Sequence, residues 1–210
     1  ANATRAAEKM DSTMSGIGSK LKSAALSLGA GFAALDVIKT TARFQSLDNA
    51  IKSTSGTSVN GEKNLSFLND QIDRLGLDIQ AAYSGYKTFN GALMGSTLQG
   101  TKANNMFRQI SEATTVMGLS GEQTEGAFLA MGQMISKGTV QAEELKGQLG
   151  ERIPGAFQIA ARAMGMTTQE LGKFMQDGKL VAEDFLPKFG AEMERTFGKQ
   201  AGKASESLQS

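Results

Sequence analysis

Hydrophobic residues recur at steps of three and four along most of this chain, which is the spacing of one face of an α-helix. Between residues 62 and 75 the pattern predicts one amphipathic helix, with an apolar face of Leu65, Leu68, Ile72 and Leu75. Residues 23–52 predict one or two further helices, with apolar positions at Phe32, Leu35, Ile38, Phe44, Leu47 and Ile51. No stretch alternates apolar and polar residues over the length of a strand, so we expect an all-α fold of multiple short helices with little or no β-sheet.

Three turns in the middle of the chain share one pattern, in which an apolar residue and a helix-capping residue follow a glycine. They read LGLD at residues 75–78, MGLS at 117–120 and MGMT at 164–167. Glycine closes the last turn of a helix in a left-handed conformation, and Asp, Ser or Thr accepts a free backbone N–H at the start of the next helix. In the second and third turns, Gln123 and Glu170 complete a capping box. The pattern therefore predicts structural roles for Gly76, Asp78, Gly118, Ser120, Gly165 and Thr167.

A second pattern recurs at an offset of 40 residues. The segment KGTVQAEEL at residues 137–145 aligns with DGKLVAEDF at 177–185, so that Gly138 matches Gly178. The first two glycine turns have a similar offset, 118 − 76 = 42. A repeated period near 40 is typical of stacked helical hairpins, although three imperfect copies also arise by chance in a glycine-rich helical chain. We therefore expect imperfect helical-hairpin repeats whose third unit is irregular.

Other residues in the same region predict local packing. Gly147 and Gly150 lie inside a helical pattern, where each costs about 1 kcal/mol relative to alanine. They indicate either a close approach between helices or a break before Pro154, which suits the first turn of the following helix. Met131 and Met134 indicate core positions or, alternatively, an adaptable binding surface.

Composition excludes several classes of function. The 210 residues include no His, Cys or Trp, and 22 basic residues nearly balance 21 acidic ones. Without His or Cys, the commonest general base, thiolate nucleophiles and zinc clusters are excluded. The near-neutral charge gives no electrostatic argument for specific nucleic-acid binding. We therefore expect no enzyme, no catalytic, cofactor-binding or metal-binding residues, no cofactor and no small-molecule substrate.

One catalytic alternative stays open. Paired carboxylates alone support glycoside hydrolysis, which makes a peptidoglycan hydrolase module the rival enzyme reading. Most acidic residues of this region fall in the opening turns of predicted helices, where the helix dipole favours them. The candidate acids are Glu143, Glu144, Glu151, Glu183 and Asp184.

The chain divides by composition into four parts. We expect a flexible N-terminal arm (1–22), a small-residue helix and loop (23–61), a helical domain (62–197) and a polar C-terminal linker toward a missing downstream chain (198–210). The apolar run at residues 23–35 is shorter than the roughly 20 residues that span a bilayer, so it indicates close helix packing or, alternatively, a transient membrane contact. The first residue is Ala1 rather than Met, which indicates a segment of a longer polypeptide.

The motifs SKGTVQAEELKGQLGERIPGA, MGMTTQEL and DGKLVAEDFLPKF agree in order and spacing with a known family. With the preceding segment RLGLDIQAAYSGYKTFNGALMGSTL, they resemble the N-terminal tape-measure domain of bacteriophage tail tape measure proteins. The resemblance covers at least residues 65–190 and is loose over the first 60 residues.

The resemblance implies a virion structural protein of a phage or prophage tail. Members of the family are long helical chains that set tail length, lie in the tube lumen and leave the tube ahead of DNA during ejection. The implied partners are other tape measure copies, tail tube or baseplate proteins, and tail assembly chaperones in the host cytoplasm, with membrane contact only during ejection. At 210 residues, this chain is far shorter than a full ruler. We therefore interpret it as a folded module of a longer chain, with a generic helical adaptor as the alternative.

Overall fold

The computed structural model describes residues 34–209, and helices account for most of them. In chain order the first elements are α2 (Ala34–Thr54), α3 (Ser58–Leu75), α4 (Ile79–Ala92), α5 (Thr101–Val116) and α6 (Gly121–Lys137). The later elements are the π-helix η1 (Glu143–Leu149), α7 (Gly150–Arg152), α8 (Ala156–Ala163), α9 (Thr168–Gln176) and α10 (Ala182–Gln209). No strand occurs within residues 34–209, so the prediction of an all-α fold is confirmed.

The chain forms two compact units, residues 1–46 and 47–210. In the first unit the described residues are the beginning of α2, and the expected arm at residues 1–22 and most of the apolar run at 23–35 lie outside the described part of the chain. No helix of residues 34–209 is long and apolar enough to cross a membrane.

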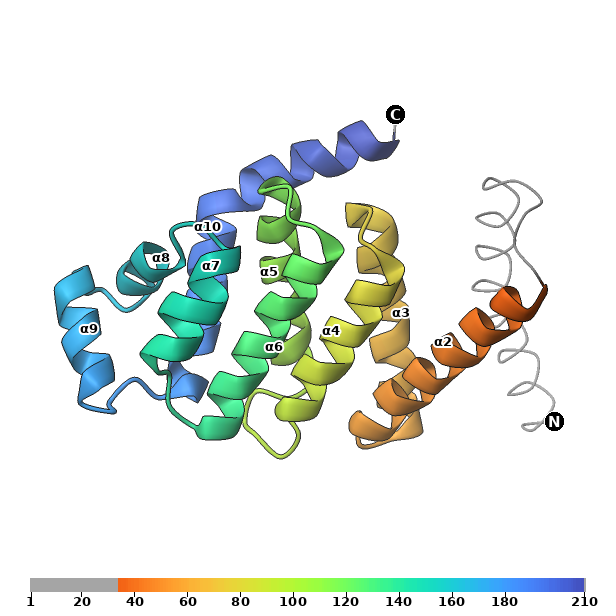
Figure 1. Cartoon of the computed structure of the whole chain (residues 1–210), viewed down its shortest axis with the longest axis horizontal. Helices are drawn as coiled ribbons and strands as arrows, with labels where there is room; N and C mark the ends of the chain where they lie inside the picture. The colour runs from red at the N-terminus through yellow and green to blue at the C-terminus, as the bar shows by residue number, and fades with distance from the viewer. Residues whose placement is uncertain (1–33, 210) are drawn as a thin grey trace. The chain divides into compact units, whose positions relative to one another are not determined.

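Consecutive helical hairpins stack in the second unit. The hairpin α3–α4 is followed by α5–α6, and α4 lies along α6 in the same direction (Figure 1). The contacts are in register, because Gly121 lies against Asp78 at one end of the pair and Gly132 lies against Ala92 at the other. The 42-residue offset of the turns therefore corresponds to a physical repeat of two stacked hairpins.

The third repeat unit departs from this stack. The third glycine turn joins α8 to α9, but α8 packs against α10 and η1. The position beside α5 is occupied by α10, which contacts α5 along its length (Figure 1). This irregularity agrees with the altered spacing of the third unit in the sequence.

The two copies of the 40-residue pattern pair with each other. Thr139 and Val181 form an isolated antiparallel bridge. The amide of Val140 donates to the carbonyl of Leu180 at 2.8 Å, and the amide of Ala182 donates to the carbonyl of Gly138 at 3.0 Å. Val140 and Leu180 are equivalent positions of the two copies, and both are buried. This short clip joins the end of α6 to the start of α10.

An aromatic cluster occupies the core between the two stacked hairpins. The ring of Phe107 on α5 stacks on Phe128 of α6, with ring centroids 4.5 Å apart. Tyr86 of α4 meets Phe107 edge-on at 5.0 Å, and Phe67 of α3 meets it at 6.2 Å. One ring from each of four helices thus meets at Phe107, which is fully buried.

Several boundaries and packing expectations differ from the structure. The expected loop at residues 53–61 is shorter, because Thr57 accepts the amide of Asn60 at 3.2 Å and begins α3 four residues early. Residues 198–209, expected to form a polar linker, continue α10. Met131 and Met134 are fully buried, which favours the core reading over a binding surface.

The two glycines of the later helix mark a change in helix type. Glu143–Leu149 is a π-helix, a form that is rare and usually short. A Cβ at Gly147 would meet nothing within 4 Å, and one at Gly150 would meet only the carbonyl of Leu145, at 3.2 Å. Neither glycine is required for a close helix approach, so the alternative of a local break in the α-helix fits better.

Gly85, one of the glycines in the α4–α6 contact, gives a first prediction about stability. A Cβ at Gly85 would lie 3.0 Å from a ring carbon of Phe128, which is itself fully buried. We expect Gly85→Ala to lower the free energy of unfolding by about 1–3 kcal/mol through overpacking. Urea denaturation measures the change. Gly147→Ala is the matched control, and a loss as large as that of Gly85→Ala would contradict the role of close packing.

Candidate functional site

The first glycine turn connects α3 to α4 and forms as its pattern predicts. Gly76 ends α3 with a φ of 63°, a left-handed value that only glycine adopts readily. The amide of Leu77 returns to the carbonyl of Ile72 at 3.2 Å. Asp78 then begins α4, because its Oδ1 accepts the amide of Ala81 at 2.8 Å.

The second and third turns use the same chemistry with a fuller cap. Gly118 and Gly165 also have positive φ. Ser120 and Gln123 form a capping box at the start of α6. Thr167 and Glu170 form another at α9, where hydrogen bonds from the Thr167 backbone and hydroxyl lower the pKa of the Glu170 carboxyl.

The other predicted structural residues lie in connections between helices. Gly138 and Gly178 have φ of 76° and 66° and lie at the two ends of the clip described above. Pro154 lies before Gly155, the N-cap of α8, so its predicted place in the first turn of that helix is wrong by two residues. The left-handed Gly155, with φ of 79°, extends the connection and delays the helix.

A pocket lies between the first two turns, which stacking of the hairpins brings together. We call it the inter-turn pocket, and its volume is about 240 Å³. Buried apolar side chains from α3, α5 and α6 line it, including Leu75, Phe107 and Phe128. Its polar lining residues are Asp78, Ser111, Thr115 and Thr124.

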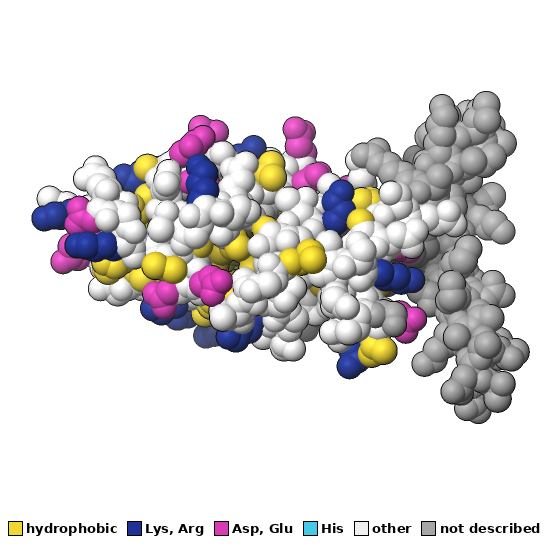
Figure 2. Space-filling model, turned by 90° about the horizontal axis from the view of Figure 1, so that it is seen from below, with side chains coloured by type: hydrophobic (Ala, Val, Ile, Leu, Met, Phe, Trp, Pro, Cys, Tyr) yellow, Lys and Arg dark blue, Asp and Glu magenta, His cyan; other side chains and the backbone are white. Residues whose placement is uncertain are grey.

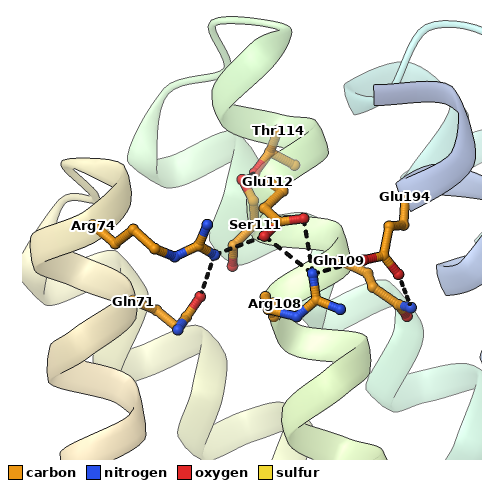
Figure 3. Close-up of polar contacts among 8 residues, drawn as sticks. All are labelled: Gln71, Arg74, Arg108, Gln109, Ser111, Glu112, Thr114 and Glu194. Atoms are coloured by element: carbon orange, nitrogen blue, oxygen red, sulfur yellow. Dashed lines mark hydrogen bonds and ion pairs between the residues drawn. The ribbon is translucent and has the colours of Figure 1, made fainter. Parts of the chain in front are cut away.

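A polar network joins three helices beside this pocket (Figure 3). The carboxylate of Glu112 on α5 is buried. It accepts a hydrogen bond from the guanidinium of Arg74 on α3 at 2.7 Å and another from Arg108 at 3.1 Å. Arg108 also pairs with Glu194 of α10 at 2.8 Å, and Gln109 donates to the same carboxylate at 2.7 Å. Hydrogen bonds from Arg108 and Gln109 lower the pKa of Glu194. The network fixes α3, α5 and α10 relative to one another.

A second carboxylate centre joins α8 to α10. The carboxylate of Glu192 accepts hydrogen bonds from the guanidinium groups of Arg195, at 2.6 Å, and Arg162, at 2.9 Å. Hydrogen bonds from Arg195 and then Arg162 lower the pKa of Glu192 to about 2. Because Glu192 is only 9% exposed, its ionised form depends on these two guanidinium groups.

This centre predicts a pH dependence of stability. The pKa of Glu192 is depressed in the folded state, so its contribution is present above the unfolded pKa of about 4.3 and is lost as pH falls toward 2. We expect about 1–2 kcal/mol, because Arg162 and Arg195 are 46% and 69% exposed and solvent screens the pairs. Urea denaturation from pH 7 to pH 2.5 measures it. The stability gap between the original chain and Glu192→Gln should shrink with acid, and a constant gap would contradict this assignment.

The five carboxylates proposed for a hydrolase do not line the inter-turn pocket. Glu144 is fully buried and pairs with Lys137, which also lies 3.5 Å from Glu143. Glu183 and Asp184 lie on the exposed surface of α10. The hydroxyl of Thr97 donates to Glu183 at 2.7 Å, and the ammonium of Lys188 lies 2.8 Å from the carboxylate of Asp184. Glu151 is exposed as well. Within residues 34–209, no group of three acidic side chains is arranged to hold a metal ion.

Sequence reasoning missed both carboxylate centres and the pocket. Arg74 and Glu112 are 38 residues apart, and Arg162 and Glu192 are 30 apart. No local pattern links such residues, because each pair forms only when its helices pack. The one available signal was the pair Arg108 and Glu112, opposite charges four residues apart on one face of α5.

Comparison with known proteins gives a consistent result. A family model described as "Tape measure protein" matches residues 36–210. Over 132 residues the chain is 42% identical to a protein of Salmonella phage Felix O1 (isolate Felix O1-VT1) named "Probable tape measure protein". The match covers 63% of this chain but only 17% of the phage protein. No solved structure matches the chain.

Proposed function

Because this chain belongs to the tape measure protein family, we propose that it is a folded docking module of a phage tail tape measure protein. In this proposal the module anchors the tape measure chain to other tail parts, whereas sequence beyond the module sets tail length and leaves the tube during ejection. The family is structural, and the proposal assigns the module no catalytic role.

The observation that carries the proposal is the way the chain folds back on itself. A ruler converts residue number into length, at about 1.5 Å per residue of straight helix. Here α4 and α6 lie side by side in the same direction, and α10 returns along α5 (Figure 1). Adding a hairpin to such a stack adds little length, so these residues are better suited to binding than to measuring.

The surface supports a docking role. Figure 2 shows acidic and basic side chains interspersed over one face, with hydrophobic side chains between them. Exposed hydrophobic side chains include Val59 in the first turn of α3 (60% exposed), Met94 after α4 (52%) and Val181 before α10 (48%). Interfaces that form and separate are about as apolar as the rest of a protein surface, so this mixed surface is compatible with docking.

Affinity pull-down tests the proposal. The tagged chain is incubated separately with purified tail tube, baseplate and tail assembly chaperone proteins from the same phage. We expect one of them to be retained by the tagged chain and not by the tag alone. Retention of none of the three would contradict the docking role.

A further inference from the structure

The inter-turn pocket is lined by one buried hydroxyl without a partner in the described chain, that of Ser111. The buried serine and threonine side chains among the described residues are those of Ser111, Thr114 and Thr124. Thr114 donates to the carbonyl of Ser111 at 3.1 Å. The hydroxyl of Ser111, which is fully buried, has no partner within the described chain. Ser111 lines the pocket, where an unpaired hydroxyl costs stability unless a polar group reaches it.

The charge of the pocket selects the kind of group. Asp78 is its one charged lining residue, and no lysine or arginine lines it. One carboxylate oxygen of Asp78 caps Ala81, and the other has no partner within the described chain. The positive ends of α4 and α6 are already capped by Asp78 and Ser120, whereas the ends of α3 and α5 present the negative end of the helix dipole. The pocket therefore favours a cation over an anion.

The apolar lining selects the rest of the ligand. Leu75, Ala82 and Phe107 are buried around the pocket, and Leu77 and Leu119 are half-buried at its rim. Lysine and arginine combine an apolar stem with a charged end, and they commonly bury the stem while the charge stays near water. A purely apolar side chain would leave the free oxygen of Asp78 unpaired, and a carboxylate would be repelled by Asp78.

We propose that the inter-turn pocket binds a lysine or arginine side chain from a partner polypeptide. The stem lies against Leu77 and Leu119, and the cation pairs with the free oxygen of Asp78. The identity of the partner as a tail protein rests on the docking role proposed above, whereas the chemistry of the pocket does not.

A small cation tests the pocket directly. n-Butylammonium, which reproduces the lysine stem and charge, is titrated into the ¹⁵N-labelled chain and followed by NMR. We expect saturable shifts at the amides of Ala81, Gly118 and Leu119. Asp78→Asn should weaken binding by about threefold, the scale of one exposed ion pair, because asparagine keeps the helix cap but lacks the charge. Glu122→Gln, which removes an exposed acid outside the pocket, is the control and should bind like the original chain.

Three results would overturn the pocket assignment: no saturable shift, equal binding of uncharged n-butanol, or equal weakening by Asp78→Asn and Glu122→Gln. The amide spectrum of each variant reports whether it is folded. The docking role fails separately, because it is tested by pull-down of tail proteins. Pocket binding without any retained tail protein would remove the docking role alone.

Discussion

Phe107→Ala is expected to lower the free energy of unfolding by about 3–5 kcal/mol, the range for a buried aromatic ring replaced by alanine. The ring of Phe107 contacts Phe67, Tyr86 and Phe128, which come from the three other helices of the stacked hairpins. All of these neighbours are held by their own helices, so the cavity left by the ring cannot collapse easily. Urea denaturation measures the change, and a domain of this size has only about 5–15 kcal/mol to lose.

Phe174→Ala on α9 provides the matched control, because it removes the same ring from a half-buried position at the edge of the core. We expect a loss of less than about half that of Phe107→Ala, in proportion to the smaller apolar area buried. Equal losses for the two variants would show that the hairpin stack is not centred on Phe107.

Glu112→Ala is expected to cost about 3 kcal/mol, because it leaves Arg74 and Arg108 without their shared buried carboxylate. Both guanidinium groups remain 29–35% exposed, which places the loss at the lower end of the range for broken buried pairs. Glu112→Gln keeps a hydrogen-bond acceptor and should lose less. Thermal and urea denaturation measure both variants.

Glu122→Ala is the control for this network. It removes an exposed acid in the first turn of α6 and should change stability by no more than about 0.5 kcal/mol. If Glu112→Ala were as mild as this control, the network in Figure 3 would be a surface feature that does not hold α3, α5 and α10 together.

The glycine turns show how much of the fold local chemistry specifies. Gly76 and Asp78 end one helix and begin the next through bonds within a few residues, so their positions follow from residue type alone. The all-α class follows from the helical spacing of apolar residues for the same reason. Thr57 shows the limit, because its polar surroundings resemble a loop, and only its bond to Asn60 distinguishes a helix cap.

The spatial arrangement of the repeats was not predictable in this way. The offset of 42 residues corresponds to stacking of α4 on α6, whereas the offset of 40 corresponds to the hydrogen bond between the equivalent residues Val140 and Leu180. A period in the sequence indicates that two segments are similar, but it does not indicate how they pack against each other. The pocket and the network around Glu112 form between packed helices, so they could be identified only from the structure.

The length of assembled tails tests the central claim most directly. The segment encoding residues 47–201 is duplicated in the tape measure gene that contains this chain, and tail lengths are measured by electron microscopy. A folded docking module predicts tails of unchanged length. A measuring rod would lengthen every tail by about 1.5 Å for each added residue, and that result would contradict the account.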